Sequence, residues 1–137
     1  MSPMTPAAAD AFLRDLHVGV LAVERNSKPP LAVPIWYDVD ESGNVIIWTH
    51  PDSLKAKLIE RAGRASFTVQ QEAMPYAYVT VEGHTSRASA DDVTARRIAQ
   101  RYLGENGGDG FLKSNPTDGY VIITIHKDEV RSLTYDE

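Results

Sequence analysis

Cysteine is absent from the 137-residue chain, and this absence excludes disulfide bonds and thiolate ligands for a metal. A chain without cysteine is typical of a protein that works in a reducing cytosol. The sequence also lacks any apolar run that approaches the roughly 20 residues of a membrane-spanning helix. Its first residues, MSPMTPAAADAF, have neither the basic start nor the apolar segment of a secretory signal. We therefore expect a cytoplasmic protein.

Positive charge is in short supply. The chain has 14 lysines and arginines against 19 aspartates and glutamates, which gives a net charge of -5. This balance argues against a general nucleic-acid-binding or membrane-surface protein, because both classes are usually basic. The four histidines lack the spacing of metal ligands, so no metal site is expected. A G-x-S-x-G nucleophile motif and a dinucleotide-binding glycine fingerprint are also missing.

The apolar segments that are present are short, and most of them suit strands. Length and the lack of a linker predict one domain over residues 1–137, large enough to bury a sizeable core. Strands are predicted over 17–25, 31–39, 45–49, 64–72 and 77–89, with a last long strand or strand pair over 120–135. Helices are predicted over 6–16, 52–62 and 90–104, with a loop over 105–119 and an acidic tail at Asp136 and Glu137.

Many strands and few helices favour a mainly β protein with short helices. A doubly wound parallel sheet is disfavoured, because it needs a helix at nearly every crossover. The hairpin spacing in the first half of the chain predicts an antiparallel barrel, whose closure would remove the sheet edges. Pro34 has no backbone N–H, so the second strand is interrupted, bulged or at an edge there.

The helix predicted over 52–62 carries a lysine within its apolar face. Leu54, Leu58 and Ala62 recur at helical spacing and are expected to face the core. Lys55 lies about 100° around the helix from Leu54 and therefore belongs to the same face. One interpretation is a lysine whose stem covers apolar surface while its ammonium group reaches water.

The other interpretation is an anion site at the start of this helix. The free N–H groups and the partial positive charge of a helix N-terminus favour an anion. Thr49 and Ser53 supply hydroxyl groups nearby, and Lys55 adds a full positive charge. A strand–helix corner of this composition suits a phosphate group.

A second basic group lies on another side of the same helix. Lys57, Arg61 and Arg64 fall at positions i, i+4 and i+7 and therefore form one stripe. The stripe is either a solvated face, partly paired with Glu60, or a surface that binds a ligand with more than one anionic group.

Aromatic residues accompany the interrupted strand. Unpaired backbone groups around Pro34 are able to bind the edge of a flat heterocycle. Trp36 and Tyr37 are either neighbours of such a ligand or plain core and rim aromatics. Tyr76 and Tyr78 fall on one strand face, where they either pack or line a pocket.

The fragments GVLA, PIWY, WTHPDSLKAKLI, RASFTV and PYAYVTVEG follow one another in this order. Together they resemble the flavin and deazaflavin oxidoreductases of the pyridoxamine 5′-phosphate oxidase-like superfamily, and the resemblance covers residues 11–88 well. It implies a mainly β, FMN-binding split β-barrel. It also implies a homodimer with two cofactor sites at the subunit interface.

The resemblance further implies which residues hold the cofactor. The S-x-K corner that holds the cofactor phosphate in such proteins maps onto Ser53 and Lys55, with Thr49 from the preceding strand. Tyr76 and Tyr78 are expected to form the pocket wall over the ring, together with Trp36. The backbone that lies along the ring maps onto Val33, Pro34, Ile35 and Trp36.

Within the superfamily, the sequence is most similar to the actinobacterial subgroup that uses the 8-hydroxy-5-deazaflavin coenzyme F-420. The polyglutamate tail of that coenzyme would give Lys57, Arg61 and Arg64 a purpose. The implied activity is hydride transfer between the deazaflavin and a small conjugated organic substrate. An FMN-dependent enzyme of the same fold is one alternative, and a carrier that binds a flavin-type cofactor without turnover is another. The C-terminal substrate-binding motifs of the pyridoxal-phosphate-forming members are missing.

Overall fold

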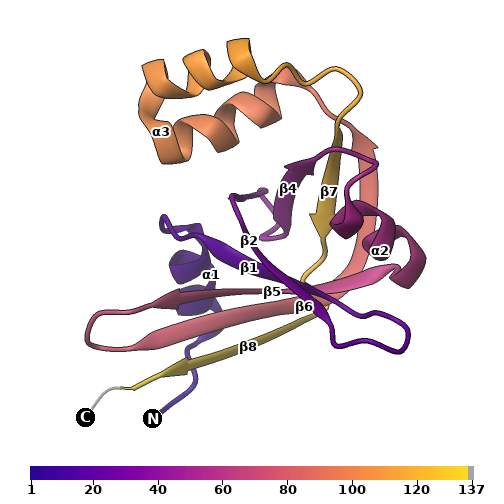
Figure 1. Ribbon diagram of the computed structural model, residues 1–137. Helices are drawn as coiled ribbons and strands as arrows, with labels where there is room; N and C mark the ends of the chain where they lie inside the picture. The colour runs from indigo at the N-terminus through magenta and orange to yellow at the C-terminus, as the bar shows by residue number, and fades with distance from the viewer. Residues whose placement is uncertain (136–137) are drawn as a thin grey trace.

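A curled antiparallel sheet dominates the computed structural model, which describes residues 1–135 (Figure 1). The expected acidic tail, Asp136 and Glu137, lies outside the described residues. The elements in chain order are α1 (Pro6–Arg14), β1 (Gly19–Val23), β2 (Leu31–Ile35), β3 (Asp38–Val39), β4 (Val45–Thr49), α2 (Leu54–Ala62), β5 (Arg64–Gln71), β6 (Ala77–Ser89), α3 (Asp92–Ser114), β7 (Val121–Ile125) and β8 (Glu129–Thr134).

One long strand joins the two halves of the sheet. Within residues 1–135 the strand order is β2-β1-β5-β6-β7-β4-β3, with β8 also paired to β6. Residues 77–82 of β6 pair with β8, and residues 85–89 pair with β7. Gly83 lies between these two stretches, where any Cβ atom would overlap the carbonyl oxygen of His126. The bend of β6 therefore depends on a residue without a side chain.

The expectation of a closed barrel is wrong. The sheet ends at β2 on one side and β3 on the other, and these strands pair with β1 and β4 and not with each other. Trp36 and Tyr37 link β2 to β3 and turn the chain from one half of the sheet to the other. The result is an open, curled half-barrel, mainly β with few helices, which is consistent with a split barrel.

Alternation along the strands produces the core. The strands β1 and β4 bury every second residue, as expected for strands with one face on the core. The core also contains Tyr37 of the PIWY segment. The sequence left open whether Tyr37 lies beside a ligand or packs in the core, and the structure buries it fully. The largest fully buried side chains are Tyr37, Phe67, Leu21, Ile47 and Ile98.

Helix α2 follows the predicted boundaries, but its buried face differs from the expected one. Ser53 is the N-cap residue, and Gly63 ends the helix in the left-handed conformation with φ of 71°. The prediction that Leu54 faces the core is wrong, because 55% of this residue is exposed. The buried face includes Ile59, and Leu54 lies about 140° around the helix from it. Lys55 lies only about 40° from Ile59 and is half-buried.

The loop predicted over 105–119 is wrong for residues 105–114, which form the second half of α3. Gly104 breaks the helix with φ of 77° and ψ of 174°, so α3 is a helical hairpin (Figure 1). A Cβ atom on Gly108 would lie 2.8 Å from the backbone nitrogen of Gln100. The glycines that suggested a loop instead allow the two halves of α3 to pack closely.

The other predicted elements need only small corrections. The strand predicted over 31–39 is divided into β2 and β3, and Pro34 lies on the edge strand β2, as its missing N–H requires. The segment over 120–135 is a strand pair, β7 and β8, but both strands pair with β6. No helix in residues 1–135 combines the length and the apolarity that crossing a membrane requires.

Candidate functional site

A cavity of about 510 Å³ lies between the α2 corner, the end of β2 and helix α3. It brings together six of the residues that the sequence singled out, although they come from two separate segments of the chain. These residues are Pro34, Ile35, Trp36, Thr49, Ser53 and Lys55.

Hydroxyl groups and a lysine form the polar end of the cavity. The Oγ1 atom of Thr49 lies 3.2 Å from Oγ of Ser53. The Ser53 hydroxyl donates to the carbonyl oxygen of His50 at 2.8 Å and accepts from the N–H of Ala56 at 3.2 Å. Lys55 is half-buried and makes no ion pair with any other residue in the described part of the chain. This corner therefore offers a cation and a helix N-terminus to an anion.

Aromatic rings form the opposite wall. Trp36 stacks on Tyr102 with ring centroids 4.9 Å apart, and it also contacts Phe111 at 5.5 Å. Trp48 lies 6.0 Å from the rings of both Phe111 and Tyr120. The Nε1 atom of Trp48 is buried without a hydrogen-bond partner among residues 1–135. A flat aromatic ligand suits such a wall, because it can stack on these faces.

Helix α3 closes the outer side of the cavity, and sequence reasoning missed this contribution. Ile98, Phe111 and Asn115 come from α3 and its C-cap. Trp48 comes from β4, and Tyr120 directly precedes β7. Phe111 stands in the glycine-rich segment that was predicted to be a loop. No local pattern places Phe111 beside Trp36, because the two residues are separated by 74 intervening residues.

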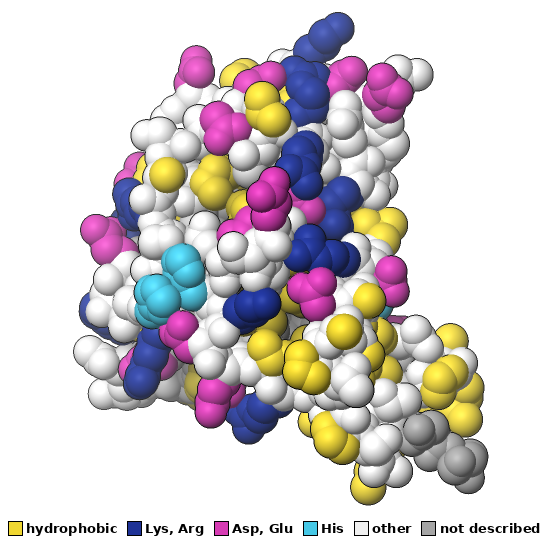
Figure 2. Space-filling model, turned by 180° about the vertical axis from the view of Figure 1, so that it is seen from behind, with side chains coloured by type: hydrophobic (Ala, Val, Ile, Leu, Met, Phe, Trp, Pro, Cys, Tyr) yellow, Lys and Arg dark blue, Asp and Glu magenta, His cyan; other side chains and the backbone are white. Residues whose placement is uncertain are grey.

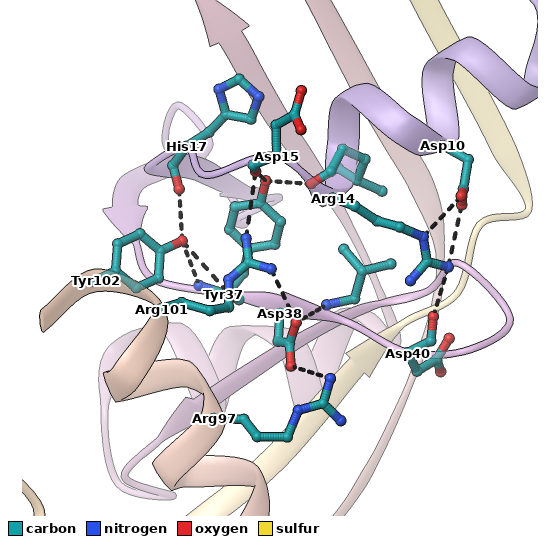
Figure 3. Close-up of polar contacts among 12 residues, drawn as sticks. Asp10, Arg14, Asp15, His17, Tyr37, Asp38, Asp40, Arg97, Arg101 and Tyr102 are labelled. Carbon is teal, nitrogen blue, oxygen red and sulfur yellow. Dashed lines mark hydrogen bonds and ion pairs between the residues drawn. The ribbon is translucent and has the colours of Figure 1, made fainter. Parts of the chain in front are cut away.

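A buried carboxylate ties α3 to the sheet (Figure 3). Asp38 of β3 is 6% exposed; one of its oxygens lies 3.1 Å from an Arg101 nitrogen and the other 3.2 Å from an Arg97 nitrogen. The Tyr102 hydroxyl donates to the carbonyl oxygen of His17 at 2.6 Å. Burial raises the pKa of Tyr102, so this hydroxyl stays a proton donor.

Five predicted site residues do not line this cavity. Val33 packs against the core, and Lys57 and Arg61 are exposed on α2. Tyr76 and Tyr78 line a separate hollow at the far end of the β5–β6 hairpin. The structure therefore places six of the predicted site residues in one cavity, Val33 against the core, and the other four on two other surfaces of the chain.

The third member of the basic stripe already has a partner. The Nε atom of Arg64 lies 2.6 Å from a carboxylate oxygen of Glu24, and this hydrogen bond lowers the pKa of Glu24. Arg64 lies on β5 and not on α2, because Gly63 ends the helix before it. Lys57 and Arg61 are thus the two members of the stripe that remain on the helix surface.

A second polar cluster lies away from this cavity, where two of the four histidine side chains lie side by side (Figure 2). His84 and His126 stack with ring centroids 4.1 Å apart. The hydrogen bond with the His84 ring lowers the pKa of Asp128, and Ser86 contacts His126 at 2.8 Å. Among residues 1–135 no group of three or more His, Cys, Asp or Glu side chains is arranged to hold a metal ion.

The curled half-barrel sheet, with a lysine-bearing corner that opens on an aromatic cavity, defines a split-barrel protein. The family model of pyridoxamine 5′-phosphate oxidase matches residues 5–127, so the chain belongs to that family. No curated protein sequence matches the chain.

Solved structures support the same fold. The conserved hypothetical protein Rv2991 from Mycobacterium tuberculosis is 21% identical, with a TM-score of 0.77 over 96% of this chain and 86% of that one. An FAD-binding protein from Mesorhizobium loti is 17% identical, with a TM-score of 0.69 over 96% of this chain and 95% of that one. An FAD-binding protein from Mycobacterium smegmatis is 12% identical, with a TM-score of 0.65 over 98% of this chain and all of that one.

Proposed function

We propose that the protein is an oxidoreductase that holds a flavin-type cofactor in the cavity between α2, β2 and α3. It moves a hydride between this cofactor and a small conjugated organic substrate. The observation that carries the proposal is that one cavity combines a corner suited to an anion with a wall suited to a flat ring. The Thr49–Ser53–Lys55 corner opens directly onto the aromatic wall. The family and the FAD-binding structural neighbours support it.

The residues of the cavity fit such a group. Lys55 and the hydroxyl groups of Thr49 and Ser53 would hold a phosphate at the start of α2. The backbone of β2 around Pro34 would lie along the ring edge, and Trp36 would face the ring. The bound cofactor supplies the hydride chemistry, while these side chains bind it, orient it and exclude water.

Among flavin-type cofactors, we propose the deazaflavin coenzyme F-420 first and FMN as the alternative. Lys57 and Arg61 are exposed on α2 and are able to meet the carboxylates of a polyglutamate tail. Lys57 lies about 200° around the helix from Lys55, so the tail must pass around α2 to reach both. FMN has no tail and needs only the phosphate corner.

We also propose that the protein acts as a homodimer with its cofactor sites at the subunit interface. Tyr76 and Tyr78 lie outside the cavity of their own chain. They act as a pocket wall, as proposed, only if they reach the cavity of a partner subunit.

Titration of the purified, cofactor-free protein tests the proposal. F-420, FMN and FAD are added separately, and binding is followed by cofactor fluorescence and by quenching of the two tryptophans. We expect saturable binding of F-420 or FMN, followed by oxidation of the reduced cofactor when conjugated enones or quinones are supplied. Saturable binding without turnover of any substrate would instead favour a carrier protein. Failure to bind any of the three would contradict the proposal.

A further inference from the structure

We propose that Asp38 is a positioning residue for this cavity. Through Arg97 and Arg101 it holds α3 where Phe111 and Asn115 form the outer wall of the pocket. As far as the ligand is concerned, this inference rests on the proposed function. Its structural part, that a polar clamp sets the place of α3, stands on the contacts of the protein alone.

Most buried side chains of helix α3 lie outside the main core cluster. The ribbon diagram shows α3 standing to one side of the sheet, joined to it by its two ends (Figure 1). Ala95, Ile98, Ala99 and Leu112 of α3 are buried, but none of them belongs to the main core cluster. Tyr102 is the one α3 side chain, within residues 1–135, that packs against that cluster. Helix α3 therefore meets the sheet mainly through aromatic contacts at Trp36 and Trp48 and through the ion pairs of Asp38.

The clamp constrains both the place and the rotation of α3. Arg97 and Arg101 are one turn apart and present their guanidinium groups from the same helix face. Each of them contacts a different oxygen of Asp38 (Figure 3). The carboxylate is itself fixed, because its Oδ1 atom accepts the backbone N–H of Val39 at 2.8 Å. Rotation of α3 about its axis would break at least one of these contacts.

A series of direct contacts connects the position of α3 with the wall of the cavity. Arg101 lies with its guanidinium carbon 5.0 Å from the centre of the Tyr37 ring, and its neighbour Tyr102 stacks on Trp36. Trp36 in turn contacts Phe111, which also meets Trp48. Asp38 does not line the cavity, so it acts on a ligand only through the position of these rings.

Two buried nitrogen donors lie at the interface between α3 and the sheet. Nε of Arg101 and Nε1 of Trp48 are the buried side-chain nitrogens that lack a hydrogen-bond partner among residues 1–135. Both belong to contacts between α3 and the sheet. A buried donor without a partner costs free energy, and loss of an arginine partner would leave the buried Asp38 carboxylate without full compensation.

The substitution Arg97→Gln tests the clamp with little risk to the fold, because the Arg97 side chain is 65% exposed and lines no part of the cavity. Asp38→Asn is the stronger second variant, and it keeps an acceptor for Val39. Arg87→Gln is the matched control, since it removes an arginine that pairs with Glu60 of α2 and does not touch α3. Arg97→Lys keeps the charge and tests rescue.

The expected result has one part without ligand and one part with it. Without ligand, Arg97→Gln and Asp38→Asn should speed hydrogen exchange in residues 92–114 and weaken the near-ultraviolet circular dichroism of the Trp36–Tyr102 stack. With F-420 or FMN, affinity should fall about two- to thirtyfold. Saturating cofactor should restore the exchange protection. Arg97→Lys should recover part of each loss, and Arg87→Gln should match the wild type.

Two results would overturn the inference. One is unchanged exchange and dichroism in both clamp variants. The other is an affinity loss in Arg87→Gln as large as that in Arg97→Gln. A wild-type protein that binds neither cofactor would contradict the proposed function, and the exchange and dichroism would then still decide whether Asp38 positions α3.

Discussion

Lys55 is the residue on which the assignment of an anion site depends. It lies on the buried side of α2, and yet its ammonium group has no carboxylate partner within residues 1–135. A lysine that only covers apolar surface would reach water with its end and would not need to share a cavity with the hydroxyl groups of Thr49 and Ser53. The shared cavity favours a common anionic ligand for the three groups.

We predict that Lys55→Ala weakens cofactor binding and leaves the fold intact. A charge-assisted contact with a phosphate is worth about 1.5–3 kcal/mol, so affinity should fall by about one to two decades. Fluorescence titration measures the loss, and Lys28→Ala, in the turn between β1 and β2, is the control. Unchanged cofactor affinity in Lys55→Ala would contradict the assignment of a phosphate site to this corner.

Tyr37 shows how a residue next to the site serves the fold instead. Its hydroxyl group donates to the carbonyl oxygen of Leu13 at 2.6 Å, and its ring is fully buried. Burial raises the pKa of Tyr37 above its ordinary value of about 10. The neutral phenol is thus the form that the folded state requires.

We predict that Tyr37→Phe lowers the free energy of unfolding by about 0.5–1.5 kcal/mol near neutral pH, because one buried hydrogen bond is lost. In the wild type, the unfolded chain ionises this group first as the pH rises. The stability that depends on the neutral phenol is therefore complete below about pH 10 and is lost above it. Chemical denaturation at a series of pH values should show that the difference in the free energy of unfolding between Tyr37→Phe and the wild type becomes smaller in alkali. A gap that widens above this pH would contradict the assignment, and Tyr135→Phe is the exposed control.

At the scale of elements, local patterns predicted the strands and α2 because the relevant signals are close in sequence. Gly63 and Ser53 mark the ends of α2, and Pro34 marks an edge strand. The second half of α3 was predicted to be a loop, because four glycines outweigh its weak helical pattern. These glycines are Gly104, Gly107, Gly108 and Gly110. Only contact between the two halves, such as the pairing of Arg96 with Asp109, makes a helix there.

On the proposed function, the basic stripe on α2 is the element expected to distinguish F-420 from FMN. We predict that the double variant Lys57→Ala/Arg61→Ala loses affinity for F-420 and hardly changes affinity for FMN. Exposed charge pairs are each worth about 0–1 kcal/mol, so the loss should be at most about one to two decades. Raised salt should remove most of the difference, because exposed charges are screened.

Arg64→Ala serves as a comparison within the same stripe. Its contact with Glu24 must break before it can meet a tail, so we expect a smaller effect than for the double variant. Lys28→Ala/Lys127→Ala, which removes two lysines outside α2, is the charge-matched control. Equal small losses for F-420 and FMN would mean that the stripe is a solvated helix face.

At the scale of the whole molecule, the candidate site was predictable only where its residues are close together in the sequence. Thr49, Ser53 and Lys55 lie within seven consecutive residues, so their chemistry is visible in the sequence. The wall made by Phe111 and Asn115 depends on how α3 folds back, and no spacing reveals it. The distance of Tyr76 and Tyr78 from this cavity likewise follows from the length of the β5–β6 hairpin.

We predict a dimer in solution, because a half-open barrel with the candidate cofactor cavity at its rim needs a partner wall. On the sheet face opposite the core, Val20 is 42% exposed and lies in register with Thr68 and Thr80, whose hydroxyl groups are 2.8 Å apart. Such a face of small side chains permits close approach of a second sheet. Light scattering at micromolar concentration should return twice the 15.1 kDa mass of the chain.

The substitution Val20→Arg connects the dimer with the site. Placing a charge on this face should dissociate the subunits, and cofactor affinity should fall with dissociation because Tyr76 and Tyr78 would then be lost from the partner's cavity. Val93→Arg, on an exposed position of α3, is the control for a surface valine replaced by arginine. A monomeric wild type would contradict the dimer. A monomeric Val20→Arg variant with full affinity would show that each chain binds its cofactor alone, and Tyr76 and Tyr78 would then have no role in the site.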